Sequence, residues 1–155
     1  MARFADLYAR VSPRLAHKPG SSLFSRTHAR LLRRSGGRLG RKFLGADVLV
    51  LRTVGRRSGK TREAPVMFVL HGDAFAVVAS NAASQSPPAW WLNLQAEPEA
   101  DAFVDGAWHS IRARRATEEE RSLLWPRLAA MYSGYDHYLS LATRELPLVL
   151  LEPRP

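Results

Sequence analysis

The chain of 155 residues contains no cysteine, which excludes disulfide bonds, thiolate zinc sites and cysteine nucleophiles. It also lacks any apolar run longer than a strand, and residues 1–4 lead into mixed sequence without the apolar stretch of a secretory signal. We therefore expect neither secretion nor a membrane span. Apolar residues make up 46% of the chain, enough for the core of one ordinary domain. This combination favours a cytoplasmic protein.

Acidic residues are scarce at the front of the chain. Residues 1–62 contain sixteen Lys or Arg against two acids, whereas residues 63–155 contain seven Lys or Arg against twelve acids. A basic front and a mildly acidic back favour an anionic partner at the front: nucleic acid, acidic lipid or a highly charged cofactor.

Several common site motifs are missing. The five histidines show no metal-ligand spacing, and no Ser/His/Asp set is persuasive, so the sequence predicts neither a metal site nor a hydrolytic triad. No Gly-x-Gly-x-x-Gly follows a strand, and there is no Walker motif. Rossmann and P-loop folds are therefore excluded.

Short apolar runs predict six strands, over residues 47–52, 64–70, 75–79, 100–104, 108–114 and 146–151. The connections are too short for crossover helices, which predicts antiparallel pairing. Prolines at 87 and 88 open a predicted helix over residues 89–94, and a capping box at Thr117 begins another. That second helix is expected to bury Leu123, Leu124, Leu128 and Met131. The fold predicted is mainly β with flanking helices: a small barrel or roll of about six antiparallel strands in a single domain.

Residues 1–45 are expected to form a basic N-terminal helical segment ahead of a barrel domain over residues 46–155. A short helix is predicted over residues 4–11, and a basic amphipathic helix from Ser22 to just before Gly36. Residues 37–42 are interpreted as a flexible basic linker. The amphipathic helix either lies on an acidic membrane surface or packs against the barrel with its arginines in water.

The stretch over residues 53–65, between two predicted strands, is unusually rich in cations and glycines. Glycines bring backbone N–H groups close to a ligand, and paired arginines hold phosphate or carboxylate. The stretch is either an anion site or a solvated basic hairpin tip. Its members are Thr53, Gly55, Arg56, Arg57, Ser58, Gly59, Lys60, Thr61 and Arg62.

Two aromatic groups stand out beyond this loop. Trp90 and Trp91 precede Asn93 in a predicted helix, and Tyr132, Tyr135 and Tyr138 follow one another at intervals of three. On one helix this spacing places the tyrosines along a single edge, which is either a pocket wall or an amphipathic face of the core. Together with the basic stretch, they suggest a cofactor with an anionic tail and a flat ring.

These motifs occur in an order that resembles the deazaflavin-dependent nitroreductase family of actinobacteria, from about residue 46 to Pro153. They are residues 53–65, the pair Ala79-Ser80, residues 88–94 and the three tyrosines after Met131. The resemblance implies a split β-barrel that binds coenzyme F420, an 8-hydroxy-5-deazaflavin with a phosphate and a polyglutamate tail.

The resemblance also implies roles for individual residues. The tail would contact Arg56, Arg57, Ser58 and Arg62; the ring would lie by Pro65, Met67, Val78, Ala79, Ser80 and Asn81; Trp90 and Asn93 would help to close the site. Tyr132, Tyr135 and Tyr138, with Ser80, would border the substrate and act in catalysis. Asn81 departs from the family, which commonly has a lysine there.

The function implied is an oxidoreductase that uses reduced F420 to transfer hydride to a quinone-like or nitroaromatic acceptor. Its partner would be that small molecule, with no nucleic acid expected. Peripheral association of residues 1–45 with the inner face of an acidic membrane, and homodimerisation, follow by analogy. Three alternatives stay open: an FMN-binding split-barrel reductase, an F420 carrier without turnover, and a basic module for nucleic acid or acidic lipid.

Overall fold

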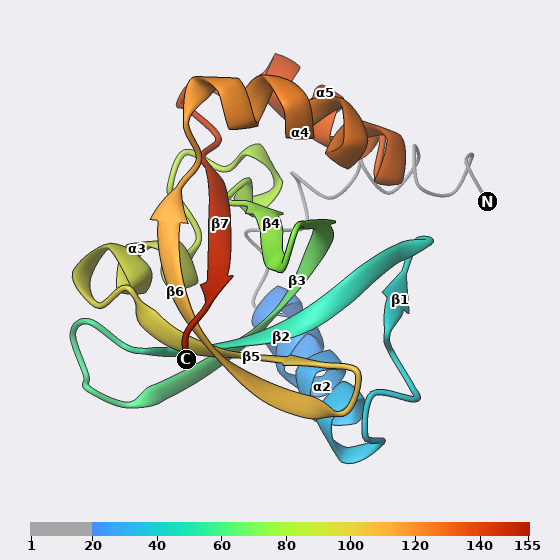
Figure 1. The fold of residues 1–155 in the computed structure, drawn as a ribbon, viewed down its shortest axis with the longest axis vertical. Coiled ribbons are helices and arrows are strands. Elements are labelled where there is room, and N and C mark those ends of the chain that lie inside the picture. The colour runs from blue at the N-terminus through green and yellow to red at the C-terminus, as the bar shows by residue number, and fades with distance from the viewer. Residues whose placement is uncertain (1–19) are drawn as a thin grey trace.

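A computed structural model of the protein describes residues 20–155, so the helix predicted over residues 4–11 lies outside the described part. Six strands close into an antiparallel barrel in the order β2-β3-β4-β7-β6-β5, with β5 pairing back onto β2 (Figure 1). The split β-barrel predicted from the sequence is confirmed. The strands are β2 (Ala46–Val54), β3 (Thr61–His71), β4 (Ala74–Val78), β5 (Glu99–Val104), β6 (Ala107–Arg115) and β7 (Leu148–Pro153).

Strand β2 shows why the sequences of these strands are continuous apolar runs. Successive side chains of a strand point to opposite faces. Leu49 and Leu51 point into the barrel core, whereas Val48 and Val50 pack outside it in a cluster with Leu32 of helix α2 (Gly20–Arg34). Because both faces are covered, the usual alternation of apolar and polar residues is lost.

The remaining helices cover the barrel at separate places (Figure 1). Helix α3 (Ala89–Ala96) sends Trp91 and Leu94 into the barrel core. Helices α4 (Glu118–Met131) and α5 (Gly134–Leu141) pack together over β4 and β7. On α2, Ala29 and Leu32 are buried, while Arg30 and Arg34 are exposed.

Two expectations about local structure are wrong. Leu123 is 60% exposed, because the buried face of α4 is set by Leu124 and Leu128, and Leu123 lies one residue off that face. The linker expected over residues 37–42 is a hydrogen-bonded turn that ends in a two-residue strand, β1 (Lys42–Phe43). Gly37 is needed in this turn because its φ is +83° and a Cβ would meet the Gly106 nitrogen at 3.0 Å.

The three tyrosines lie on two helical segments, because Gly134 interrupts the helix, as a glycine at this position indicates. Tyr132 ends α4 with φ −142°, and Tyr135 and Tyr138 belong to α5. The break is built around Gly134, where a Cβ would collide with the Tyr132 ring. The tyrosines therefore converge through a bend between two helices.

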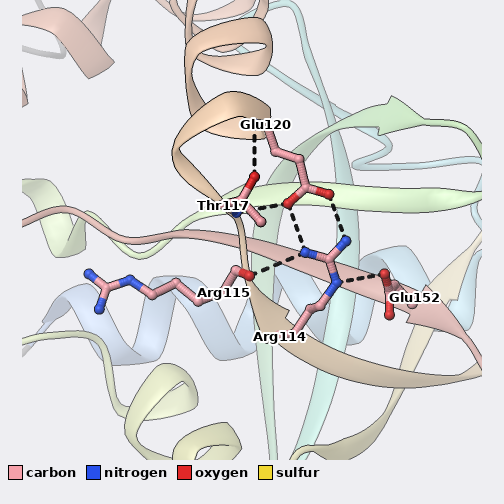
Figure 2. A network of polar contacts seen from close by, with 5 residues as sticks. All are labelled: Arg114, Arg115, Thr117, Glu120 and Glu152. Atoms are coloured by element: carbon pink, nitrogen blue, oxygen red, sulfur yellow. Dashed lines mark hydrogen bonds and ion pairs between the residues drawn. The ribbon is translucent and has the colours of Figure 1, made fainter.

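An arginine ties two strands to helix α4 near the barrel end (Figure 2). Arg114 of β6 donates to both carboxylate oxygens of Glu120 at 2.7 Å and to Glu152 of β7 at 2.7 Å. Glu120 also completes the capping box with Thr117, which confirms the predicted helix start. The Arg114 guanidinium, followed by the Thr117 backbone N–H, lowers the pKa of Glu120 to about 2.

Candidate functional site

A cavity of about 310 Å³ lies outside the barrel, between β3, the end of β4, α5 and α2. Nine residues proposed from the sequence line it: Pro65, Met67, Val78, Ser80, Asn81, Trp90, Tyr132, Tyr135 and Tyr138. They come from segments up to 73 positions apart in the chain, between Pro65 and Tyr138. The barrel therefore gathers most of the expected ring and acceptor site in one place.

The tyrosines form the most connected wall of this cavity. The Tyr132 and Tyr138 hydroxyl oxygens lie 3.0 Å apart and share a hydrogen bond. The Tyr135 ring meets the Tyr132 ring edge-on at 5.3 Å between centroids. Burial, followed by the nearby Tyr138, raises the pKa of Tyr135 well above its ordinary value, so this phenol stays protonated at neutral pH. The wall thus consists of three phenol rings in contact, two of them joined by their hydroxyls.

A second wall is a short turn of unusual backbone conformation. Asn81, Ala82 and Ala83 have φ values of 46°, 50° and 59°, the left-handed region that residues with a Cβ rarely adopt. Ser80 begins the turn, and Ser80, Asn81 and Ala82 all line the cavity. Ala79, which was also expected at the ring, is fully buried in the barrel core and does not line the cavity.

Arg144 holds this turn from the other side. Its guanidinium donates to the carbonyl oxygens of Ser80 at 2.7 Å and Ser84 at 2.8 Å, with longer bonds to Ala79 and Ser86. Sequence reasoning missed Arg144, because it lies between α5 and β7 in a segment without a motif. Burial lowers its pKa from the ordinary value.

The basic loop between β2 and β3 lies away from the cavity. Arg56, Arg57, Ser58 and Lys60 are exposed, as is Arg62 at the start of β3. Among the described residues, none of these four cations takes part in an ion pair. From Lys60 to Pro65 the strand extends about 16 Å, so one long ligand can reach both the loop and the cavity.

Asn93 fixes the base of this loop and does not line the cavity. Its amide nitrogen donates to the Thr53 hydroxyl at 3.0 Å, and its amide oxygen accepts from the Arg56 backbone N–H at 3.1 Å. Both Asn93 and Thr53 are buried, at 4% and 3% exposure. The loop is thereby anchored to helix α3, the same helix that carries Trp90 to the cavity.

The cavity also includes residues that were not proposed for the site from the sequence. His28 of α2 lies on its rim, with Nε2 2.8 Å from the Gly40 carbonyl oxygen that accepts its hydrogen bond. The sequence of α2 could not indicate that His28 lies at the cavity, because this depends on which surface of the barrel the helix packs against. The others are Phe43, Val48, Ala64, Val66, Ala82 and Pro88.

Residues 20–155 contain neither a candidate metal-binding group nor a candidate membrane-spanning helix. No group of three or more His, Asp or Glu side chains is placed to hold a metal ion in this part of the chain. No helix of the same part is long and apolar enough to cross a membrane.

Comparison with known proteins identifies the family. The model of the F420H(2)-dependent quinone reductase family matches residues 24–153. The chain belongs to this family. The match covers the barrel, all the predicted site residues and most of α2, and it confirms the relationship that the motifs predicted.

Relatives in the F420H(2)-dependent quinone reductase family support this assignment. A Mycobacterium tuberculosis protein named for this activity is 32% identical over 106 residues, 68% of this chain and 89% of its own. An F420H(2)-dependent quinone reductase of Mycobacterium tuberculosis H37Rv is 28% identical over 133 residues, 83% of this chain and 89% of its own.

Solved structures agree with the fold. An F420-H2 dependent reductase, FDR-A, superposes with a TM-score of 0.62 at 28% identity, over 68% of this chain and 93% of its own. A structure described as a domain-swapped dimer superposes with a TM-score of 0.65 at 26% identity, over 87% of this chain and all of its own.

Proposed function

We propose that the chain uses reduced coenzyme F420 to reduce a quinone-like acceptor in the tyrosine-walled cavity. Its class, an F420-dependent oxidoreductase, follows from the family to which it belongs. One observation supports this placement of the cofactor and the acceptor. Strand β3 connects a cationic loop, which has no carboxylate partners among the described residues, to an aromatic cavity.

The loop fits the anionic tail of the cofactor. Arg56, Arg57 and Arg62 are exposed guanidinium groups, and each is suited to bidentate bonds with phosphate or carboxylate. Gly59 has φ +64°, which lets the loop turn tightly. Because Asn93 anchors the Arg56 backbone, part of the loop is ordered before the tail binds.

The cavity fits the flat ring. Pro65 and Met67 of β3 form an apolar floor, and Trp90 adds an aromatic side. Its volume of about 310 Å³ lies within the range of ligand pockets. Ser80 and Asn81 lie at its edge, where polar groups of a ring would meet them.

Reduced F420, when bound, supplies the hydride that reduces the acceptor, and a proton completes the reduction of a quinone to a hydroquinone. The residues of this chain orient the acceptor and limit the access of water. Of the bonded hydroxyls of Tyr132 and Tyr138, one donates to the other, and the proton of the second would donate to the acceptor oxygen on which negative charge develops. Tyr135, kept neutral by burial, and Ser80 complete the polar part of the wall.

The test is a titration of purified protein with F420 and with FMN, followed by fluorescence quenching. We expect F420 to bind at micromolar concentration and more tightly than FMN. Oxidation of reduced F420, followed by absorbance, should then depend on an added naphthoquinone or benzoquinone. Tighter binding of FMN would move the protein to the flavin-using alternative, and F420 binding without quinone-dependent turnover would make it a carrier.

Association with an acidic membrane is a second candidate property, supported by Arg26, Arg30 and Arg34, which are exposed on α2. Co-sedimentation with vesicles that contain anionic lipid, lost at high salt, would support it, whereas equal recovery with neutral vesicles would refute it. A homodimer is supported by the related structure described as a domain-swapped dimer. Light scattering after gel filtration tests this state.

A further inference from the structure

We propose that Arg144 is a positioning residue for the reaction: it clamps the left-handed turn that sets Ser80 and Asn81 at the cavity wall. This inference rests on the proposed function, because it assigns Arg144 to the same cavity. Arg144 does not line the cavity itself, so its effect on the reaction passes through the turn.

The contacts of Arg144 are those of a backbone clamp. Its guanidinium bonds peptide carbonyls on both sides of the turn, those of Ala79 and Ser80 before it and Ser84 and Ser86 after it. Among the described residues, no ion pair with a carboxylate includes Arg144. The neighbouring Glu145 pairs with Arg115 instead. A planar fork of five N–H donors suits this task, whereas a single ammonium group does not.

The turn needs such a clamp. Asn81, Ala82 and Ala83 are consecutive residues with a Cβ in the left-handed region, a conformation that persists only where surrounding contacts impose it. Within the turn, the backbone N–H of Ala83 donates to the Ser80 carbonyl and that of Ser84 to the Asn81 carbonyl, while the Asn81 side-chain amide donates to the Ser86 carbonyl. Arg144 connects this turn to the segment before β7.

Loss of the clamp therefore predicts a local change. The turn should relax towards right-handed conformations, and Ser80 and Asn81 should leave the positions from which they line the cavity. The barrel core is built elsewhere, from residues of β2 to β7 and α3, and should persist. Such a site would still bind the tail of the cofactor but would align the ring and acceptor poorly.

The first experiment measures the turn without cofactor. Hydrogen exchange of residues 79–86 is compared in the wild type, Arg144→Met and a matched control, Arg121→Met. Arg121 also donates to a backbone carbonyl, that of Leu146 at 2.9 Å, and this carbonyl lies outside residues 79–86. We expect Ala83 and Ser84 amides to exchange at least tenfold faster in Arg144→Met and to be unchanged in the control. Equal exchange rates of these amides in the two variants would refute the proposal that Arg144 clamps the turn.

The second experiment measures catalysis. Arg144→Met should lower kcat with a quinone at least tenfold while the dissociation constant for F420 changes less than threefold. Arg144→Lys should stay within threefold of Arg144→Met, because one ammonium group cannot bridge both sides of the turn. If lysine restores the wild-type kcat, charge and not the fork is what matters, and the proposal is wrong.

A third variant covers the case in which Arg144→Met does not fold. Ala83→Gly removes the Cβ at φ 59° without touching the cavity lining. In the Ala83→Gly background, we expect Arg144→Lys to lower kcat by less than a third of the factor by which it lowers kcat in the wild-type background. The reason is that glycine removes the strain at one of the three left-handed residues. Equal losses in both backgrounds would refute the role of the turn. If the wild type is inactive, only the proposed function is refuted, because the hydrogen-exchange comparison still tests whether Arg144 holds the turn.

Discussion

Replacing Asn93 with alanine should loosen the cationic loop and weaken F420 binding together. Asn93 is 4% exposed and makes two hydrogen bonds, one to the Thr53 hydroxyl and one from the Arg56 backbone N–H. Alanine removes both bonds at once. It also leaves the Thr53 hydroxyl, at 3% exposure, without this buried partner.

The expected loss of stability follows from these bonds. Each is worth about 1 kcal/mol, and leaving a buried hydroxyl unsatisfied adds about 1 kcal/mol more, so the free energy of unfolding should fall by about 2–3 kcal/mol. For a domain of this size, that corresponds to a fall in Tm of about 5–10 °C.

The loss of affinity has a separate origin. Without Asn93, the Arg56 backbone is no longer held at α3, and the loop must be ordered when the cofactor tail binds. Fixing about one residue of backbone costs about 1–2 kcal/mol, which raises the Kd for F420 by about 5–30-fold. Thr53→Val serves as the matched control, because it removes one of the two bonds but leaves the bond to Arg56.

Thermal unfolding and fluorescence titration with F420 measure the two effects. We expect Asn93→Ala to change both Tm and Kd, and Thr53→Val to lower Tm while Kd stays within about threefold. If Asn93→Ala lowers Tm but leaves Kd unchanged, the loop does not hold the tail. An unchanged Tm would show that the two bonds contribute nothing.

Three other changes probe separate parts of the molecule. Arg57→Ala should raise the Kd for F420 by about tenfold through loss of a charged contact, measured by titration; an unchanged Kd would remove Arg57 from the tail site. Tyr138→Phe should leave this Kd unchanged and lower kcat with a quinone by about tenfold, measured by stopped-flow absorbance; loss of F420 binding would contradict the division into ring site and acceptor wall. Glu120→Gln should destabilise the protein clearly less at pH 2.5 than at neutral pH, measured by urea unfolding. The folded pKa of Glu120, about 2, lies below the ordinary 4.5, so its stabilisation is present above 4.5 and is lost as pH falls towards 2; a constant difference between the two proteins at all pH values would exclude this link.

The sequence predicted the parts of the fold that depend on local pattern. The capping box at Thr117 is a short-range signal, and it occurs as expected. The dipeptide Asp105-Gly106, which is typical of hairpin turns, connects β5 and β6. The motif order identified the family and the barrel. The collection of Pro65, Ser80 and the tyrosines in one cavity depended on the family resemblance, since no local pattern places them together.

What the sequence did not reveal depends on contacts between distant segments. Arg144 bonds carbonyls about 60 residues away, and a carbonyl carries no sequence signal. The glycine at position 134 indicated an interruption of the helix, but not the close approach of the Tyr132 ring, which no local pattern shows. Leu123 is apolar but exposed, so periodicity alone assigned it to the wrong face of α4.

The position of β7 has a consequence for how the enzyme is made in the cell. This strand is the last element of the chain, yet it lies between β4 and β6 and pairs Phe75 with Leu151 (Figure 1). The barrel cannot close while these residues are still inside the ribosome, and Arg144 cannot reach its turn until shortly before then. Such long-range pairing slows folding. We therefore expect a chain in which β7 has not yet joined the barrel to be unable to capture its cofactor.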